Sequence, residues 1–168
     1  MTLNASYLKL LLQNWSQTCR TAKRLAISVN RLAERLPLSI DDLQNTDEEL
    51  FEKLDAFRVR FGDLQDSLGA KVFRSLLLSE DEEPINMADT LNRMEKRQII
   101  QSAEHWRTLR EIRNAFAHDY PEAEAERVNA INLAWKVAPE LLDIADNIYH
   151  YCQRQNINLP EIERADKQ

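Results

Sequence analysis

Glycine, proline and cysteine are scarce in this sequence, and each scarcity narrows the choice of fold. With 2 glycines and 5 prolines among 168 residues, turn signals are few, which leaves room mainly for long helices with short connections. The 2 cysteines, Cys19 and Cys152, lie far apart without metal-like neighbours. We therefore expect free, buried thiols in a protein of the reducing cytoplasm.

Long apolar runs and nucleotide or metal motifs are also absent. No stretch approaches the roughly 18 apolar residues of a membrane span, and the N-terminus lacks the charged start and small-residue cleavage site of a signal peptide. A soluble, cytosolic protein without membrane contact is the expectation. The sequence has no glycine-rich phosphate loop, no His-Glu-x-x-His and no Cys-x-x-Cys, so we expect neither a metal nor a cofactor.

Positive charge is in short supply as well. The formal net charge is −6, whereas affinity for a phosphate backbone comes mostly from Lys and Arg. This excess of negative charge argues against a protein that coats nucleic acid without sequence preference. Any contact with RNA or DNA must come from a local basic patch.

Amphipathic patterns fill most of the chain. An apolar stripe with helical spacing ends before Pro37 and comprises Leu8, Leu12, Trp15, Cys19, Ala22, Ala26, Val29, Ala33 and Leu36. A second helix is predicted to begin with Thr46 as its cap and Glu49 reaching back, and to run on through residues 71–78. The following SEDEEP segment is typical of a solvated acidic loop.

Three further helices are predicted in the second half. A short one covers residues 86–100, and Ser102 can cap the next, whose buried face comprises Trp106, Leu109, Ile112 and Phe116. The last carries an apolar stripe from Val128 to Cys152 and bends at Pro139. These patterns predict an all-α fold, an antiparallel bundle of about five helices. We expect residues 1–168 to form one domain with a frayed tail over 157–168.

The stretch RNAFAHDY, residues 113–120, concentrates reactive side chains at the end of a predicted helix. On a regular helix Arg113 and His118 would point about 140° apart. Tyr120 precedes Pro121, so the helix should end near His118 and let the imidazole approach the arginine. Arg107 and Arg110 continue a basic ridge along the helix, which Lys96 and Arg97 extend.

This cluster suits metal-independent cleavage of RNA. His118 can exchange a proton with a ribose hydroxyl or a leaving oxygen, and Arg113 can stabilise negative charge on the phosphate. Because the reaction needs both a base and an acid, and the cluster holds one histidine, a homodimer that joins two clusters is expected.

A purely structural interpretation stays open. Arg113 can pair with Glu111, Glu104 or Asp119. His118 can cap the helix C-terminus, where its partial positive charge is favoured, and Tyr120 can pack in a turn. His105 and His150 are interpreted as surface or satisfied helix residues.

The stretch also matches the R-x-x-x-x-H-x-Y signature of the HEPN superfamily. Residues 90–121, TLNRMEKRQIIQSAEHWRTLREIRNAFAHDYP, and the later APELL resemble the HepT-like toxins, which are encoded beside a minimal nucleotidyltransferase antitoxin, MntA. The resemblance covers roughly the C-terminal half. It implies an all-α homodimer with facing motifs and a ribonuclease that harms its host until it is neutralised.

The resemblance also implies roles for single residues. Arg113 and His118 would be the catalytic pair, with Asn114 in support. Tyr120 would be the residue that the nucleotidyltransferase adenylylates, which places an anion and a bulky adenosine beside the histidine. Asp119 would either orient His118 or oppose phosphate. The alternative is a binding protein and not an enzyme: a substrate-binding partner of a nucleotidyltransferase, a partner that itself would catalyse no reaction.

Overall fold

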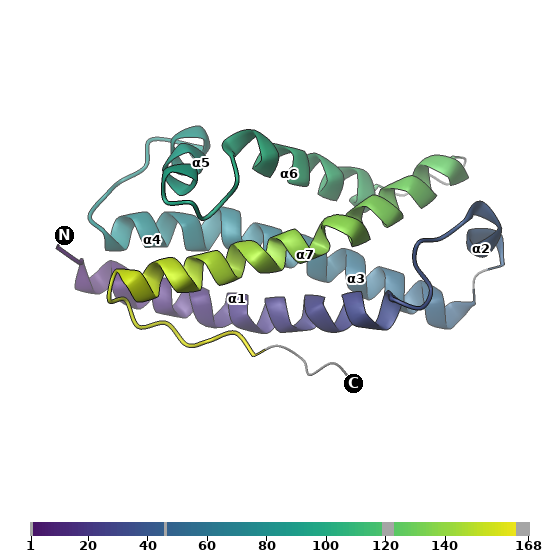
Figure 1. Ribbon diagram of the computed structural model, residues 1–168, viewed down its shortest axis with the longest axis horizontal. Helices are drawn as coiled ribbons and strands as arrows, with labels where there is room; N and C mark the ends of the chain where they lie inside the picture. Colours follow the sequence, from purple (N-terminus) through teal and green to yellow (C-terminus); the bar gives the residue numbers. More distant parts are fainter. Residues whose placement is uncertain (1, 46, 119–122, 164–168) are drawn as a thin grey trace.

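The protein is an elongated bundle of helices. A computed structural model describes residues 2–45, 47–118 and 123–163. Within these ranges every regular element is a helix, and the four longest helices alternate in direction along the chain (Figure 1). The predicted all-α antiparallel bundle is therefore confirmed. None of the helices in the described ranges combines the length and hydropathy needed to cross a bilayer.

The helix order follows the predicted one with a single addition. The elements are α1 Ala5–Leu32, α2 Ile40–Gln44, α3 Glu48–Asp66, the π-helical segment η1 Ser67–Val72, α4 Phe73–Ser79, α5 Met87–Lys96, α6 Ala103–Ala117 and α7 Glu124–Arg154. Helices α3, η1 and α4 form one rod, as expected. The short α2 was not predicted; the side chain of Ser39 and that of Asp42 stabilise its start in a capping box.

Capping side chains begin most of these helices. Ser102 caps α6 as predicted, because its side chain accepts a hydrogen bond from the backbone N–H of His105 at 2.9 Å. At α3 the cap is Asp47, which accepts from the N–H of Leu50. Thr46, the predicted cap, lies outside the described residues. The predicted reach of Glu49 back to Thr46 falls outside the described residues for the same reason, and the Glu49 side chain pairs with Lys53 at 3.0 Å.

The buried face of α1 is rotated from the predicted stripe. Leu11 is fully buried, whereas Leu12 is 38% exposed. The true face includes two polar residues, Thr18 and Ser28, whose hydroxyls have partners inside the bundle: Thr18 Oγ1 lies 2.5 Å from Ser67 Oγ, and Ser28 accepts from Arg60 at 2.8 Å. A stripe drawn from apolar residues alone misses such a face, because hydrogen-bonded hydroxyls can be buried.

The acidic segment after α4 is only partly solvated, which corrects two expectations. The Glu80 side chain is 0% exposed and accepts a 2.6 Å hydrogen bond from Nη2 of Arg97. Tyr151 of α7 donates its hydroxyl to the same carboxylate. Arg97 therefore belongs to a buried ion pair and does not extend the basic ridge. A buried charge requires a partner of this kind.

The segment after α7 is ordered against α1 as far as it is described. Ile157 and Leu159 are 2% and 4% exposed, and the indole N–H of Trp15 donates to the carbonyl of Pro160 at 2.8 Å. The expectation of a frayed tail is thus wrong for residues 157–163, because burial of these two side chains offsets the loss of chain entropy.

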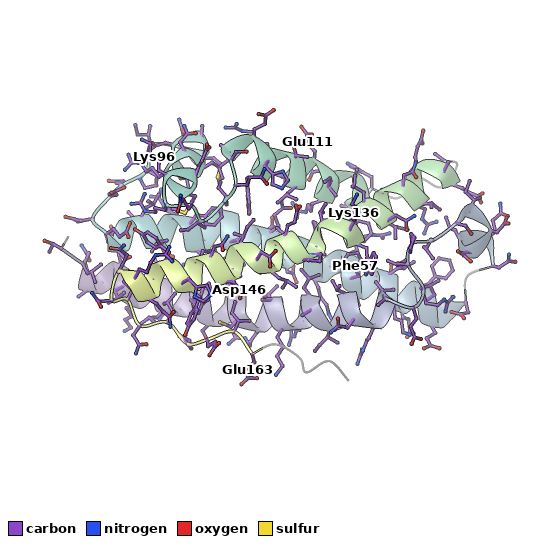
Figure 2. All side chains as sticks on the ribbon, viewed as in Figure 1. Phe57, Lys96, Glu111, Lys136, Asp146 and Glu163 are labelled. Atoms are coloured by element: carbon purple, nitrogen blue, oxygen red, sulfur yellow. The ribbon has the colours of Figure 1, made fainter. Side chains whose placement is uncertain are left out.

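Helix α7 packs along α1, α3 and α6 and closes the bundle. It continues through Pro139 and changes direction partway along its length (Figure 1). Figure 2 shows Phe57 pointing between the helices, whereas Glu111 and Lys96 lie on the outside. Both cysteines are free, Cys152 buried and Cys19 half-buried, in agreement with the expected thiols.

Candidate functional site

Aromatic packing fixes the end of α6 against α3. The Phe116 ring lies 5.1 Å from that of Phe57 and 6.2 Å from that of Phe61, measured between ring centroids, and Phe116 is 2% exposed. The guanidinium of Arg58 covers the same ring at 5.5 Å. The last turn of α6 is therefore held in a defined position. The two candidate catalytic residues flank this anchor, with Arg113 three positions before Phe116 and His118 two positions after it.

Arg113 points from α6 toward α3. Its Nη2 donates to Oδ2 of Asp66 at 2.8 Å, and its Nε and Nη2 lie 3.4 Å from the place where a Cβ on Gly62 would stand. The side chain of Arg113 is 27% exposed and that of Asp66 is 58% exposed. Since the carboxylate engages one of the nitrogens, other N–H groups stay available to a phosphate.

Helix α6 ends where the sequence predicted. His118 is its C-cap, with φ −78° and ψ 130°, an extended conformation that leaves the helical path. The backbone N–H of His118 donates to the carbonyl of Asn114 at 3.2 Å, and both residues are exposed. The predicted roles of Asp119 and Tyr120 fall on residues outside the described ranges.

The basic ridge is shorter than predicted. Arg107 and Arg110 are both exposed on α6, as expected, and Arg113 follows them one turn later. Arg97 is withdrawn into its pair with Glu80, so the ridge does not reach it. Sequence reasoning missed the cation of Arg58, which is supplied by another helix.

Two of the three local pairings expected for Arg113 in a purely structural cluster are absent from the described residues, and the third, with Asp119, falls outside them. The described partner of Arg113 is Asp66 of α3 and not Glu104 or Glu111 of its own helix. His105 is a satisfied helix residue, as interpreted, because its Nε2 lies 3.0 Å from Oε2 of Glu140 on α7. The His150 ring packs edge-on against Tyr149 on the same helix.

A small pocket adjoins the pair of Arg113 and Asp66. Its volume is about 90 Å³, and its lining residues come from α3, η1, α5 and α6: Gln65, Asp66, Gly69, Ala70, Met87, Trp106 and Arg110. Gln65 is 3% exposed, and neither its Nε2 nor its Oε1 has a hydrogen-bond partner in the described structure. An amide buried in this way costs about 1–3 kcal/mol. This pocket was not predicted from the sequence.

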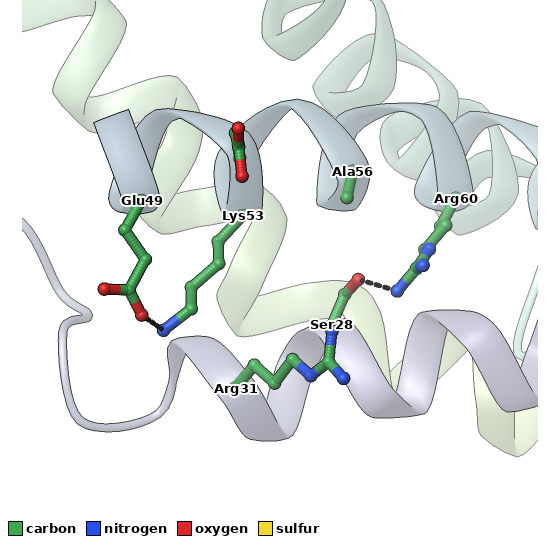
Figure 3. Close-up of a pocket in the computed structure, with 7 residues that line it drawn as sticks. Ser28, Arg31, Glu49, Lys53, Ala56 and Arg60 are labelled. Atoms are coloured by element: carbon green, nitrogen blue, oxygen red, sulfur yellow. Dashed lines mark hydrogen bonds and ion pairs between the residues drawn. The ribbon is translucent and has the colours of Figure 1, made fainter. Parts of the chain in front are cut away.

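A second pocket, of about 290 Å³, lies between α3 and α1, away from α6 (Figure 3). Two of the cations that line it are already engaged. Lys53 pairs with Glu49, and Arg60 donates to Ser28, as the dashed lines in Figure 3 mark. Its charges are therefore largely satisfied within the protein.

No group of three or more His, Cys, Asp or Glu side chains in the described ranges is arranged to hold a metal ion. Comparisons with protein-family models, with curated proteins and with solved structures find no match to this chain.

Proposed function

We propose that this protein is a metal-independent endoribonuclease of the HEPN type, the toxin of a toxin-antitoxin pair that acts in the cytoplasm. The observation that carries the proposal is the end of α6, where the helix stops at an exposed His118 while Arg113 is held one turn earlier. A histidine and a guanidinium at one helix end match the needs of phosphodiester cleavage without a metal.

The division of labour follows from the side chains. The His118 imidazole takes the proton from a ribose 2′-hydroxyl, which attacks the adjacent phosphorus, or gives a proton to the departing 5′-oxygen. Arg113 donates to the phosphate oxygens, where charge builds up in the transition state. The carboxylate of Asp66 supports this role because it orients the guanidinium across 2.8 Å. Asn114 supports the turn at His118 through its carbonyl.

Two protons must move in this reaction, and the cluster of one chain holds a single imidazole. We propose that a homodimer places two copies of the site in one cleft, so that one His118 acts as base and the other as acid. Cleavage then needs an intact His118 in both chains. An active monomer in sedimentation at micromolar concentration would contradict this part of the proposal.

A mixing experiment tests the shared site. Wild-type protein is co-refolded with increasing amounts of His118→Ala at constant total concentration. If both imidazoles are required, RNA cleavage falls with the square of the wild-type fraction, because mixed dimers are inactive. If each chain works alone, cleavage falls linearly. His150→Ala, a change at a histidine outside the cluster, serves as the matched control. Mixing wild type with this variant at constant total protein should leave the cleavage rate unchanged.

Neutralisation is proposed to occur at Tyr120, through adenylylation by a minimal nucleotidyltransferase encoded nearby. The added phosphodiester and adenosine would compete with RNA beside His118. Tyr120→Phe should therefore cleave RNA but escape silencing by that enzyme. Wild-type protein that is adenylylated equally at another residue would remove Tyr120 from this role.

A further inference from the structure

The pocket beside Arg113 has a closed floor and an open rim. The floor residues Gln65, Gly69 and Trp106 are buried, whereas Asp66, Ala70, Met87 and Arg110 at the rim are exposed. The floor lies at the start of the π-helical segment, whose widened turn interrupts the regular rod. Such segments occur often at functional sites. The pocket is thus open to solvent and lined by chemically distinct walls.

The Gln65 side chain borders the pocket with a buried amide that has no hydrogen-bond partner in the described structure. An amide presents one donor and one acceptor side by side, and both are unpaired here. A ligand that offers the complementary acceptor and donor along one edge would satisfy both. The Watson–Crick edges of nucleobases have this arrangement, and single-stranded RNA exposes them.

The Trp106 indole supplies a flat wall. A Cβ added to Gly69 would lie 2.8 Å from Cζ2 of Trp106, so only glycine lets the ring lie this close to the rod. The indole also packs against Phe73, with 4.9 Å between the centroids, which fixes its plane. An aromatic wall suits a stacked base, whereas the carboxylate of Asp66 at the rim disfavours a bare anion.

The position of the pocket links it to the proposed cleavage site. Asp66 lines the pocket and also holds the guanidinium of Arg113 at 2.8 Å. We propose that the pocket binds one base of the RNA strand, stacked on Trp106 and read by Gln65 once its buried amide turns toward the base, while Arg113 contacts a neighbouring phosphate. The identity of the ligand as RNA rests on the proposed function, but binding of a base can be tested without catalysis.

The test uses the full-length His118→Ala protein and five probes: the 5′-monophosphates of uridine, cytidine, adenosine and guanosine, and ribose 5-phosphate, which has no base. Binding is followed by NMR through the indole N–H signal of Trp106, assigned with Trp106→Phe. At least one nucleotide should shift this signal and bind about tenfold or more tightly than ribose 5-phosphate. Adding Gln65→Leu should weaken the binding of that nucleotide about tenfold. Gln101→Leu, at an exposed glutamine, should leave its binding unchanged.

Gln65→Leu replaces an amide without partners by an apolar group, so the variant should fold, and thermal melting checks this. Equal binding of all five probes, or nucleotide binding unchanged by Gln65→Leu, would overturn the base subsite. Nucleotide binding by a protein that cleaves no RNA would keep the subsite and reject the nuclease. Cleavage whose base preference is the same in wild type and Gln65→Leu would keep the nuclease and reject the subsite.

Discussion

The guanidinium of Arg113 and the carboxylate of Asp66 join α6 to α3 through a 2.8 Å hydrogen bond across 47 positions of sequence. The pair lies one turn before the end of α6 and borders the pocket of Gln65. The pair therefore connects three features: the helix end with His118, Gly62, which leaves room for the guanidinium, and the pocket of Gln65. Its contribution to function and to stability can be separated.

Asp66→Asn removes the charge that orients Arg113 while keeping its size. We expect RNA cleavage to slow about tenfold, because a loosely held guanidinium meets the phosphate less often in the productive geometry. Because the pair is partly exposed, stability should change by less than about 1 kcal/mol. Cleavage rates and urea unfolding measure the two effects. Asp63→Asn, an exposed acid one turn earlier on α3, is the control and should leave both unchanged.

Gly62→Ala and Gly69→Ala should have opposite effects on stability. A Cβ at Gly62 meets Arg113 at 3.4 Å, a contact that the long side chain can accommodate by shifting. The gain in helix propensity then stabilises the fold by up to about 1 kcal/mol, while cleavage slows. A Cβ at Gly69 lies 2.8 Å from Trp106 and forces the buried indole to move. That variant should lose about 1–3 kcal/mol. Thermal melts that rank the two variants in the reverse order would contradict this account.

Glu80→Gln should destabilise the bundle without touching the candidate site. The change leaves the guanidinium of Arg97, whose side chain is 14% exposed, without its closest carboxylate. Because Glu82 stays 3.0 Å from Nη2 of Arg97, the expected loss is about 1–3 kcal/mol in the free energy of unfolding. Glu83→Gln, an exposed neighbour in the same segment, should change it by less than about 0.5 kcal/mol. Similar urea midpoints for the two variants would show that the buried pair of Glu80 and Arg97 adds nothing to the stability of the fold.

Alkaline pH should weaken the fold through the α7 segment that carries Tyr151 and Cys152. Burial, followed by the carboxylate of Glu80, raises the pKa of Tyr151 from 10.0 to about 12 and that of Cys152 from 9.0 to about 12. Between these values the folded chain keeps protons that the unfolded chain loses, so stability falls as pH rises above about 9. Unfolding free energies measured from pH 7 to 11 test this. Tyr151→Phe should flatten the decline above pH 10, and an unchanged slope would exclude the tyrosine as its source.

The course of α6 was predictable because its signals are local. Ser102 at the start, the apolar positions through Phe116, and Pro121 beyond the end all act within a few residues along the chain. The helix therefore begins at the predicted cap and ends at His118 in the structure. Position and exposure of Arg107, Arg110 and His118 follow directly from these boundaries.

Contacts between distant segments were not predictable in the same way. The partner of Arg113 depends on how α6 rotates against α3, and one sequence does not specify that rotation. Gly62 and Asp66 lie four positions apart on α3 and so share a face, which is a usable signal only once the opposing residue is known. Glu80 looked solvated because charge runs usually are, yet Arg97 and Tyr151 bury it.

The most direct test of the central claim is cleavage of a mixed set of RNAs by purified protein in excess EDTA. We expect wild type to cut RNA and His118→Ala to lose at least about a hundredfold in rate while keeping the same melting temperature. Wild-type protein that leaves every RNA intact and is harmless when expressed would contradict the nuclease. That result would favour the alternative proposal, a binding partner of a nucleotidyltransferase without chemistry of its own.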